Sequence, residues 1–314
     1  MIPKISNMTK VLIATDKPFA PIAVKGIRNV IEDAGFQLVL LEGYTSQQDF
    51  INAIEDVDAV IVRSDKTDKS VIDAGKNLKI IVRAGAGYDN IDLAAASAKV
   101  ICVMNTPGQN SNAVAELALG LMVYGVRNYF NGKSGSELLG KSLGIHAYGY
   151  VGRNVARIAR GFGMEVYAFD PFIPREEIEK DGVKWIGTAG ELYQKCNFIS
   201  LHIPANSQTK LSINYDLLSK MPAPACLINT ARAEVINEPE LMRIFEERKD
   251  FTYLSDIEPS NKADFEAKFK GRYFFTPKKM GAQTEEANIN AGIAAANQIV
   301  KFIQTGDKTF QVNK

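Results

Sequence analysis

The chain has 314 residues, 46% hydrophobic and 23% charged, so it is long enough to bury the cores of about two domains. Its formal net charge is +1 and it has no long basic run, which argues against a nucleic-acid or anionic-membrane partner. Two histidines and three scattered cysteines, Cys102, Cys196 and Cys226, exclude a His-rich metal site and a disulfide framework, and we expect no bound metal.

The sequence contains no targeting or membrane signal that we can identify. No apolar stretch reaches the length of a transmembrane helix. The first ten residues also lack the apolar segment of a signal peptide. We therefore expect a soluble, cytoplasmic protein.

Short apolar strands alternate with helices through the first hundred residues. Strands are expected at 11–15, 36–41, 59–62, 79–82 and 100–104, and helices at 21–34, 47–54, 69–74 and 93–98. Continuous apolar strands of this kind are typical of a parallel sheet that helices cover on both faces. The pattern predicts a complete α/β domain by residue 106.

Pro107-Gly108 interrupts the alternation, and a second series of elements follows. The sequence predicts a long helix at 112–129, then strands at 143–147, 165–169, 184–186, 198–202, 226–229, 252–254 and 273–275. Helices are expected at 151–161, 175–180, 189–196, 216–219 and 239–246, and a final one at about 284–304. Proteins with two parallel-sheet domains normally bind a ligand in the cleft between the domains, and we expect the same here. We expect the segment 285–314 to cross back to the first domain.

The stretch 143–170 reads as one strand–helix–strand unit with an imperfect dinucleotide fingerprint. The fingerprint G-x-G-x-x-G has Ala147 in place of its first glycine and keeps Gly149 and Gly152. Asp170 closes the second strand, eighteen residues after Gly152, where an acid binds the ribose. The stretch therefore predicts a dinucleotide half-site, with a structural turn as the alternative.

Two loops that follow strands of the first series carry candidate anion-binding residues. Arg63 and Ser64 lie at the carboxyl end of a strand, where open sheets bind ligands, and an arginine binds phosphate or carboxylate well. The residues 84–87 (AGAG) leave backbone amides available for an anion. A solvated loop and a plain turn are the respective alternatives.

The second series carries the candidate catalytic residues. Arg232 follows a buried strand and suits a substrate carboxylate, with a structural salt bridge as the alternative. Asp256 and Glu258 follow another strand, where the first could face a nicotinamide and the second could tune a base. Lys278 and Lys279 follow the last strand, and partial burial near Arg232 would lower the pKa of one of them toward that of a general base, with a solvated surface pair as the alternative.

Together these motifs resemble the D-isomer-specific 2-hydroxyacid dehydrogenases over nearly the whole chain, and within them the phosphoglycerate branch. The segments that carry the resemblance are VRSDKT (62–67), VRAGAGYDNIDL (82–93), VMNTPGQNSNAVAEL (103–117), LGIHAYGYVGRNVA (143–156), LHIP (201–204), NTARAEVINEPEL (229–241) and TPKKMGAQT (276–284). The resemblance implies an α/β fold of two parallel-sheet domains. A Rossmann NAD-binding domain (107–281) would be inserted in a flavodoxin-like substrate domain (1–106 and 282–314).

The resemblance also implies roles for individual residues. Substrate phosphate and carboxylate groups would be bound by Arg63, Ser64, Arg83, Ala86 and Gly87, with Asn110 nearby. NAD would be bound by Gly149, Tyr150, Val151, Gly152, Asp170, His202, Ile203, Pro204, Thr230, Ala231 and Asp256, and Arg232 would be the catalytic arginine.

The sequence departs from the family pattern in the catalytic loops. The spacing from Asp256 to Glu258 is shortened, which leaves the role of Glu258 open. The family's catalytic histidine after Thr-Pro is absent, although lysine-type members exist. Counting from Thr276-Pro277 selects Lys278 for its place, whereas counting back from Gly281 selects Lys279.

The resemblance implies NAD-dependent oxidation of 3-phospho-D-glycerate to 3-phosphohydroxypyruvate, the first step of serine biosynthesis. A glyoxylate or hydroxypyruvate reductase is the alternative within the family. An NAD-sensing binding protein without turnover is the alternative of another class. We expect a homodimer through the helix at 112–129 and, since the sequence stops at Lys314, no regulatory domain and no feedback by serine.

Overall fold

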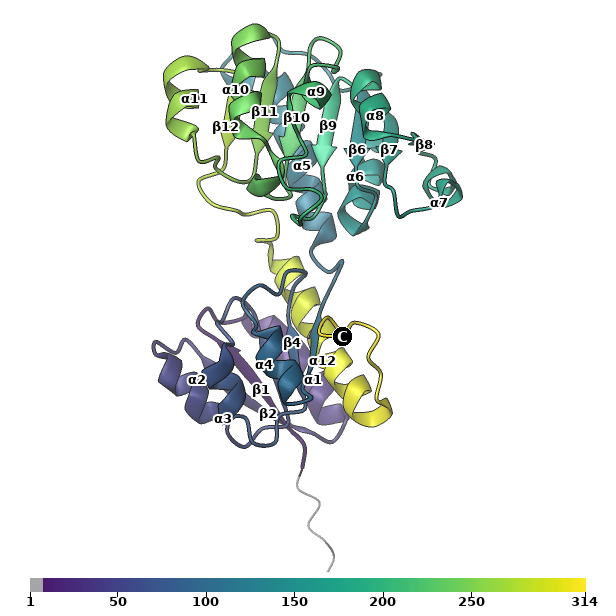
Figure 1. Ribbon diagram of the computed structural model, residues 1–314. Coiled ribbons are helices and arrows are strands. Elements are labelled where there is room, and N and C mark those ends of the chain that lie inside the picture. The colour runs from purple at the N-terminus through teal and green to yellow at the C-terminus, as the bar shows by residue number, and fades with distance from the viewer. Residues whose placement is uncertain (1–7) are drawn as a thin grey trace, which may run out of the picture. The chain divides into compact units, whose positions relative to one another are not determined.

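A computed structural model describes residues 8–314, which form two compact units (Figure 1). One unit contains the described residues up to Asn110 together with Gln283–Lys314, and the other contains Ser111–Ala282. The sequence places these borders after residues 106 and 281. The assignment of the two units to substrate and cofactor binding remains a prediction, and we describe each unit by itself.

The first unit is built on a five-stranded sheet in which every pair of strands is parallel. Its strands lie in the order β2-β1-β3-β4-β5, which is the order of flavodoxin-like folds. They are β1 (Lys10–Thr15), β2 (Gln37–Glu42), β3 (Ala59–Val62), β4 (Ile80–Arg83) and β5 (Cys102–Asn105). Both faces of the sheet are buried, which explains the uninterrupted apolar runs in the sequence.

Helices cover both faces of this sheet. One face packs against α1 (Pro21–Asp33) and α12 (Glu285–Thr305), and the other packs against α2 (Gln47–Ala53), α3 (Lys69–Ala74) and α4 (Leu93–Ala98). The segment after α12 lies along β5, where Val312 N–H donates to the carbonyl oxygen of Val103 (2.9 Å). The end of the chain therefore packs against the first unit, as the sequence leads us to expect.

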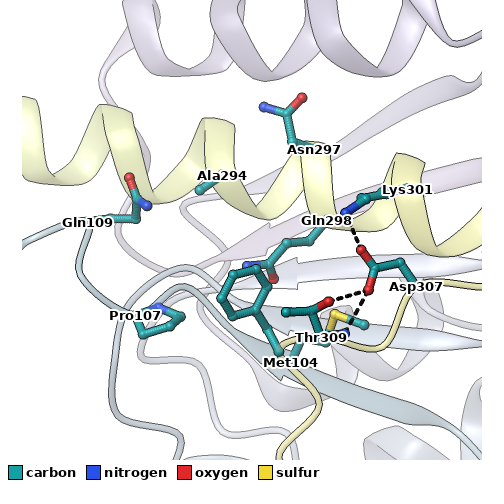
Figure 2. A pocket seen from close by; sticks show the side chains of 10 residues that line it. Met104, Pro107, Gln109, Ala294, Asn297, Gln298, Lys301, Asp307 and Thr309 are labelled. Carbon is teal, nitrogen blue, oxygen red and sulfur yellow. Dashed lines mark hydrogen bonds and ion pairs between the residues drawn. The ribbon is translucent and has the colours of Figure 1, made fainter. Parts of the chain in front are cut away.

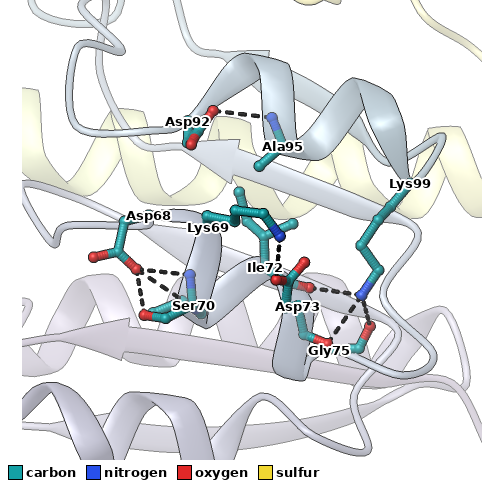
Figure 3. A network of polar contacts seen from close by, with 10 residues as sticks. Asp68, Lys69, Ser70, Ile72, Asp73, Gly75, Asp92, Ala95 and Lys99 are labelled. Carbon is teal, nitrogen blue, oxygen red and sulfur yellow. Dashed lines mark hydrogen bonds and ion pairs between the residues drawn. The ribbon is translucent and has the colours of Figure 1, made fainter.

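Polar side chains hold the ends of the two shortest helices of this unit (Figure 3). Asp68 accepts hydrogen bonds from the first amides of α3, and Asp92 accepts one from Ala95 N–H in α4 (2.9 Å). Lys99 Nζ donates to three carbonyl oxygens at the end of α3, those of Ile72, Asp73 and Gly75. A cation at this end also complements the helix dipole, so Lys99 joins α4 to α3.

The second unit is built on a seven-stranded parallel sheet in the order β12-β11-β10-β9-β6-β7-β8. Its strands are β6 (Ser142–His146), β7 (Glu165–Phe169), β8 (Lys184–Trp185), β9 (Phe198–Leu201), β10 (Cys226–Asn229), β11 (Thr252–Ser255) and β12 (Tyr273–Phe275). Counted from β6, this is the Rossmann order with one more edge strand, and the order reverses between β6 and β9. The predicted fold class is therefore confirmed.

The helices of the second unit also lie on both faces of its sheet. One core contains side chains of α5 (Ser111–Val126), α6 (Tyr150–Gly161) and α7 (Arg175–Lys180). The other contains side chains of α8 (Ala189–Lys195), α9 (Tyr215–Leu218), α10 (Glu238–Glu247) and α11 (Lys262–Lys268). None of the described helices is long and apolar enough to cross a membrane.

Two elements of the second unit differ from the sequence-based expectation. The helix α5 ends at Val126 rather than at residue 129, because residues 128–130 have positive φ angles. In addition, Ser136 N–H donates a hydrogen bond to the carbonyl oxygen of Val126 (2.8 Å). The helix α11 was not expected. It is short and mostly charged, and the fully buried ring of Phe265 holds it to the core.

Candidate active site

The turn between β6 and α6 keeps the geometry of the dinucleotide fingerprint, including the position that has lost its glycine. Ala147 has φ = 81°, a left-handed conformation that favours glycine and strains a residue with a Cβ atom. At Gly152 an added Cβ would lie 2.4 Å from the carbonyl oxygen of Ala147, so α6 can approach the turn only with glycine there. Beside Gly149 no atom lies within 4 Å of such a Cβ, which leaves room for a ligand.

The start of α6 and the end of β7 supply the groups that a dinucleotide needs. Gly149 precedes the helix and offers no side chain to cap it, so the first amides of α6 suit a pyrophosphate. Asp170 Oδ2 accepts a hydrogen bond from Tyr148 N–H (2.8 Å), and Oδ1 accepts one from Phe172 N–H (2.8 Å). These bonds hold the carboxylate at the end of β7, where it suits ribose hydroxyls.

The ends of β9 and β10 carry the remaining predicted cofactor residues. Ile203 is buried and Pro204 is exposed, whereas Thr230 and Ala231 are buried directly after β10. The Thr230 hydroxyl is buried without a hydrogen-bond partner among the described residues. Because an unpaired buried hydroxyl costs about 1–3 kcal/mol, a bound polar group at this position would remove a penalty. The second unit therefore fits a dinucleotide at the turn, at Asp170 and at Thr230.

The two histidines lie at the ends of neighbouring strands. His146 Nδ1 is 3.2 Å from the Tyr193 hydroxyl, and His202 Nε2 is 2.9 Å from the Ser200 hydroxyl. Burial lowers the pKa of His146 to about 4, and burial together with His146 lowers the pKa of His202 to about 3. Both rings are therefore neutral near pH 7, which favours a structural role.

Of the two adjacent lysines, only Lys279 places its ammonium group against the predicted catalytic arginine. Lys279 Nζ donates to the carbonyl oxygen of Ala231 (2.7 Å), and Arg232 donates to the same oxygen (2.9 Å). The residue as a whole is exposed, but its Nζ end lies among protein atoms. Burial of this end, followed by the charge of Arg232, lowers the pKa of Lys279 to about 8, against the opposing charges of Asp256 and Glu234.

The buried carboxylate of Asp256 fixes the segment that carries Lys279. Asp256 Oδ1 accepts hydrogen bonds from the Thr276 hydroxyl (3.1 Å) and from Met280 N–H (2.8 Å), and Oδ2 accepts one from Gly281 N–H (2.8 Å). Asp256 is fully buried, so these bonds are well shielded from water. Its contact with NAD remains a prediction, since its oxygens already hold the lysine segment on both sides of Lys279.

The other predicted acid and the other lysine have different surroundings. Glu258 is exposed and forms an ion pair with Lys262 (2.6 Å). Lys278 is exposed, and its carbonyl oxygen accepts the Thr276 hydroxyl (2.9 Å). The charges of Asp256 and, more weakly, Glu234 raise the pKa of Lys279, so Glu234 is an acid near the base that sequence reasoning did not assign to it. A weak signal existed, because Glu234 lies only two positions after Arg232.

In the first unit, Arg63 is held by groups of that unit. Its guanidinium donates to the carbonyl oxygen of Lys17 (3.0 Å) and to Asn288 Oδ1 (2.7 Å) and lies over the Phe19 ring. Its backbone N–H donates to the buried carboxylate of Asp65 (3.0 Å). Burial lowers the pKa of Arg63. The loop is thus an ordered structure rather than a solvated one, and Asp65 is an organising residue that we did not expect.

The loop that follows β4 lies beside the loop that contains Arg63, at the carboxyl ends of the neighbouring strands β3 and β4. Arg83 Nε donates to the carbonyl oxygen of Arg63 (3.0 Å), as does Asn90 Nδ2 (3.3 Å). Gly85 has φ = 149°, and an added Cβ would lie 1.5 Å from the Arg83 guanidinium, so only glycine lets Arg83 lie over this loop. The structure thus brings together the predicted residues Arg63 and Arg83, and Ser64, Ala86 and Gly87 follow in the same two loops.

Asn110 is half-buried and closes the first stretch of this unit. The first unit also contains a cavity of about 320 Å³ beside α12 (Figure 2). Its walls come from the end of β5, from α12 and from the last residues of the chain, and they include Met104, Gln298 and Phe310. The ion pair of Lys301 with Asp307 lies in the wall. None of the predicted site residues lines this cavity.

Comparisons with known proteins agree with this architecture. Residues 13–313 match the model of the D-isomer specific 2-hydroxyacid dehydrogenase catalytic domain. The chain is 34% identical over 312 residues to a D-3-phosphoglycerate dehydrogenase of Methanocaldococcus jannaschii, covering 95% of this chain and 58% of that protein. It is 35% identical over 283 residues to a hydroxypyruvate reductase of Thermotoga maritima, covering 84% of this chain and 91% of that protein.

A solved structure resembles the whole chain. It is the crystal structure of NAD+-bound 3-phosphoglycerate dehydrogenase of Entamoeba histolytica, with 50% sequence identity, a TM-score of 0.86 and coverage of 98% of this chain and 99% of that one. The match to the family model extends over both units and every predicted site residue. The chain therefore belongs to the D-isomer specific 2-hydroxyacid dehydrogenases and is an enzyme of that family.

Proposed function

We propose that this enzyme oxidises 3-phospho-D-glycerate at C2 to 3-phosphohydroxypyruvate, with NAD as the cofactor. The observation that carries the proposal is the pair Lys279 and Arg232, a partly enclosed amine with a pKa of about 8 beside a fixed guanidinium. A dehydrogenase needs this combination, since one group takes the hydroxyl proton and the other holds the substrate anion. Similarity to the Methanocaldococcus and Entamoeba proteins supports the phosphorylated substrate.

Residues of the second unit hold the cofactor in this proposal. The amides at the start of α6 bind the pyrophosphate, and Asp170 accepts the ribose hydroxyls. Thr230 contributes its unpaired hydroxyl. Bound NAD supplies the acceptor for the hydride that leaves C2.

Lys279, rather than Lys278, accepts the proton of the C2 hydroxyl. In its neutral form Lys279 Nζ has a lone pair, and its pKa of about 8 makes that form accessible at neutral pH. Arg232 binds the carboxylate and stabilises the charge that develops on the C2 oxygen. Asp256 fixes the backbone on both sides of Lys279, and its charge partly opposes the lowering of the Lys279 pKa.

Residues of the first unit bind the phosphate and assist with the carboxylate. The Arg83 side chain is held on the backbone carbonyl of Arg63, and the Arg63 guanidinium is held by the Lys17 carbonyl and Asn288. Ser64 is exposed beside them, and the amides of Ala86 and Gly87 follow in the next loop. Two arginines in one loop region favour a phosphate, since each can form charge-assisted hydrogen bonds with such a group.

The test is a comparison of NADH oxidation with 3-phosphohydroxypyruvate and with hydroxypyruvate. The proposal predicts a kcat/KM at least tenfold higher for the phosphorylated substrate, which two charge-assisted contacts with the phosphate can supply. Equal or inverted values would favour the second candidate, an unphosphorylated-substrate reductase like the Thermotoga protein. NAD binding without turnover of either compound would favour a sensing role.

The proposal also includes the pathway, the location and the assembly of the protein. The activity places it in serine biosynthesis, and we infer a cytoplasmic homodimer that contacts its copy through α5. The end of α5 lies near three exposed large apolar side chains, those of Phe130, Leu139 and Phe162. Light scattering during size-exclusion chromatography tests this assembly, and a Leu139→Lys variant that remains dimeric would argue against this surface.

A further inference from the structure

A polar cluster on the second unit joins the dinucleotide turn to α7. Arg153, in α6, donates from one guanidinium nitrogen to Asp181 Oδ2 (3.1 Å) and from another to Glu177 Oε2 (2.7 Å). The buried ring of Tyr148 lies under the guanidinium, with 5.0 Å between the Arg153 Cζ atom and the ring centroid. The Tyr148 hydroxyl donates to the same Asp181 oxygen (3.0 Å).

This cluster is connected to the ribose-binding acid through one residue. The backbone N–H of Tyr148 is bound by Asp170, while the side chain of Tyr148 is bound by Asp181 and covered by Arg153. Arg153 is thus separated by one residue, Tyr148, from the acid that is expected to bind the adenosine ribose. An arginine in this neighbourhood is the group that accommodates a 2′-phosphate in NADP-dependent enzymes.

The charges around Arg153 oppose that use. Glu177 and Asp181 each take one edge of the guanidinium, and Asp170 adds a third carboxylate nearby. A second cation of the cluster, Arg160, donates to the backbone carbonyl of Asp181 rather than to a carboxylate. A 2′-phosphate would have to displace two carboxylates from Arg153 and enter a region with more negative than positive side chains.

We propose that Arg153 is a cofactor-selectivity residue whose pairing with Glu177 and Asp181 keeps it from binding the 2′-phosphate of NADP. This inference rests on the proposed NAD dependence of the enzyme. Asp170 attracts the ribose hydroxyls. Glu177 and Asp181 bind the guanidinium of Arg153, so that its charge is not available to balance the negative charge of an added 2′-phosphate. Removing one carboxylate should release Arg153 toward that phosphate.

The test measures binding directly, by titration calorimetry of the full chain with NADH, NADPH, 5′-AMP and adenosine 2′,5′-bisphosphate in the absence of substrate. Glu177→Gln is expected to tighten NADPH and the bisphosphate about tenfold and to change NADH and 5′-AMP less than threefold. Glu177 is more than half exposed, so the substitution leaves the fold intact. Arg153→Gln in the Glu177→Gln background should abolish the gain.

A matched control separates release of Arg153 from a general change in charge. Glu176 lies in the same first turn of α7, so Glu176→Gln removes the same charge and should change the NADPH affinity less than twofold. The inference is overturned if Glu177→Gln leaves the NADPH affinity unchanged, if Glu176→Gln has the same effect, or if the gain survives loss of Arg153. Failure of wild-type protein to bind NADH would instead overturn the proposed function.

Discussion

Lys279 and Arg232 donate hydrogen bonds to the same oxygen, the carbonyl of Ala231, over distances of 2.7 and 2.9 Å. Two cations that share one neutral acceptor repel each other, and this repulsion adds to the effect of burial on the pKa of Lys279. The arrangement therefore favours the neutral amine. It explains how a lysine, whose ordinary pKa is near 10.4, can accept a proton near neutral pH.

Replacing the two lysines separately tests which of them acts as the base. Lys279→Ala should lower kcat by about 10²–10⁴-fold, the usual contribution of general base catalysis. Lys278→Ala should stay within about threefold of wild type, because Lys278 is exposed and contributes only its backbone carbonyl to the site. Steady-state kinetics with both variants checks this, and equal losses would contradict the assignment.

The buried carboxylate that holds the lysine segment should matter more than the exposed acid beside it. Asp256→Asn places an amide N–H₂ group against backbone N–H donors, so we expect a loss of about 2–3 kcal/mol in unfolding free energy and a lower kcat. The control is Glu258→Gln, which breaks only an exposed ion pair and should change the unfolding free energy little. Similar losses in denaturant unfolding of both variants would be evidence against the anchoring role.

Restoring the first glycine of the nucleotide turn should stabilise the protein. Ala147 has φ = 81°, and an L-residue in this conformation costs about 1–2 kcal/mol, which exceeds the entropic cost of glycine. Ala147→Gly should therefore raise the unfolding free energy by about 0.5–1 kcal/mol and Tm by roughly 1–4 °C. Ala156→Gly, in the middle of α6, should instead lower the unfolding free energy and Tm. A lower Tm for Ala147→Gly would contradict the inference that Ala147 is strained.

The two neutral histidines should make the fold sensitive to mild acid. Their pKa values in the folded protein, about 4 for His146 and about 3 for His202, lie below the ordinary value near 6.5, so the unfolded chain binds more protons below pH 6.5. The contribution of the two histidines to the unfolding free energy is fully present above that pH. It falls below that pH, by about 2 kcal/mol for each histidine between pH 7.5 and pH 5.

Urea unfolding across this pH range checks the histidine prediction. His146→Gln and His202→Gln should each remove about half of the dependence between pH 7.5 and pH 5. The neighbouring charge of Asp170 opposes the shift of His146 only in part. If the pH dependence of the unfolding free energy is undiminished in both variants, carboxylates rather than the histidines cause it.

Much of the fold follows from the sequence because both sheets are buried on two faces. Uninterrupted apolar strands separated by helices fix the elements, and the resemblance supplies the strand order that periodicity alone does not specify. The helix α11 escaped prediction because its only strong anchor is Phe265, in a mostly charged segment. The end of α5 was placed too late because the apolar pattern continues through residues that adopt positive φ angles.

The site was predictable as a set of residue types but not as a set of contacts. Local spacing could not choose between Lys278 and Lys279, because the choice depends on the hydrogen bonds of Asp256, twenty residues or more away in sequence. For the same reason Glu258 looked like the acid that tunes the base, whereas Asp256 and, more weakly, Glu234 have that electrostatic effect. Long-range contacts set both outcomes.

The most direct test of the account is the pH dependence of kcat/KM in both directions between pH 6.5 and pH 9.5. With Lys279 as the base, 3-phosphoglycerate oxidation needs the neutral amine, so its kcat/KM should rise about tenfold per unit below pH 8 and level off above it. Reduction of 3-phosphohydroxypyruvate needs the protonated amine and should fall above pH 8. Profiles without a break near pH 8, or a break that persists in Lys279→Ala, would contradict the account.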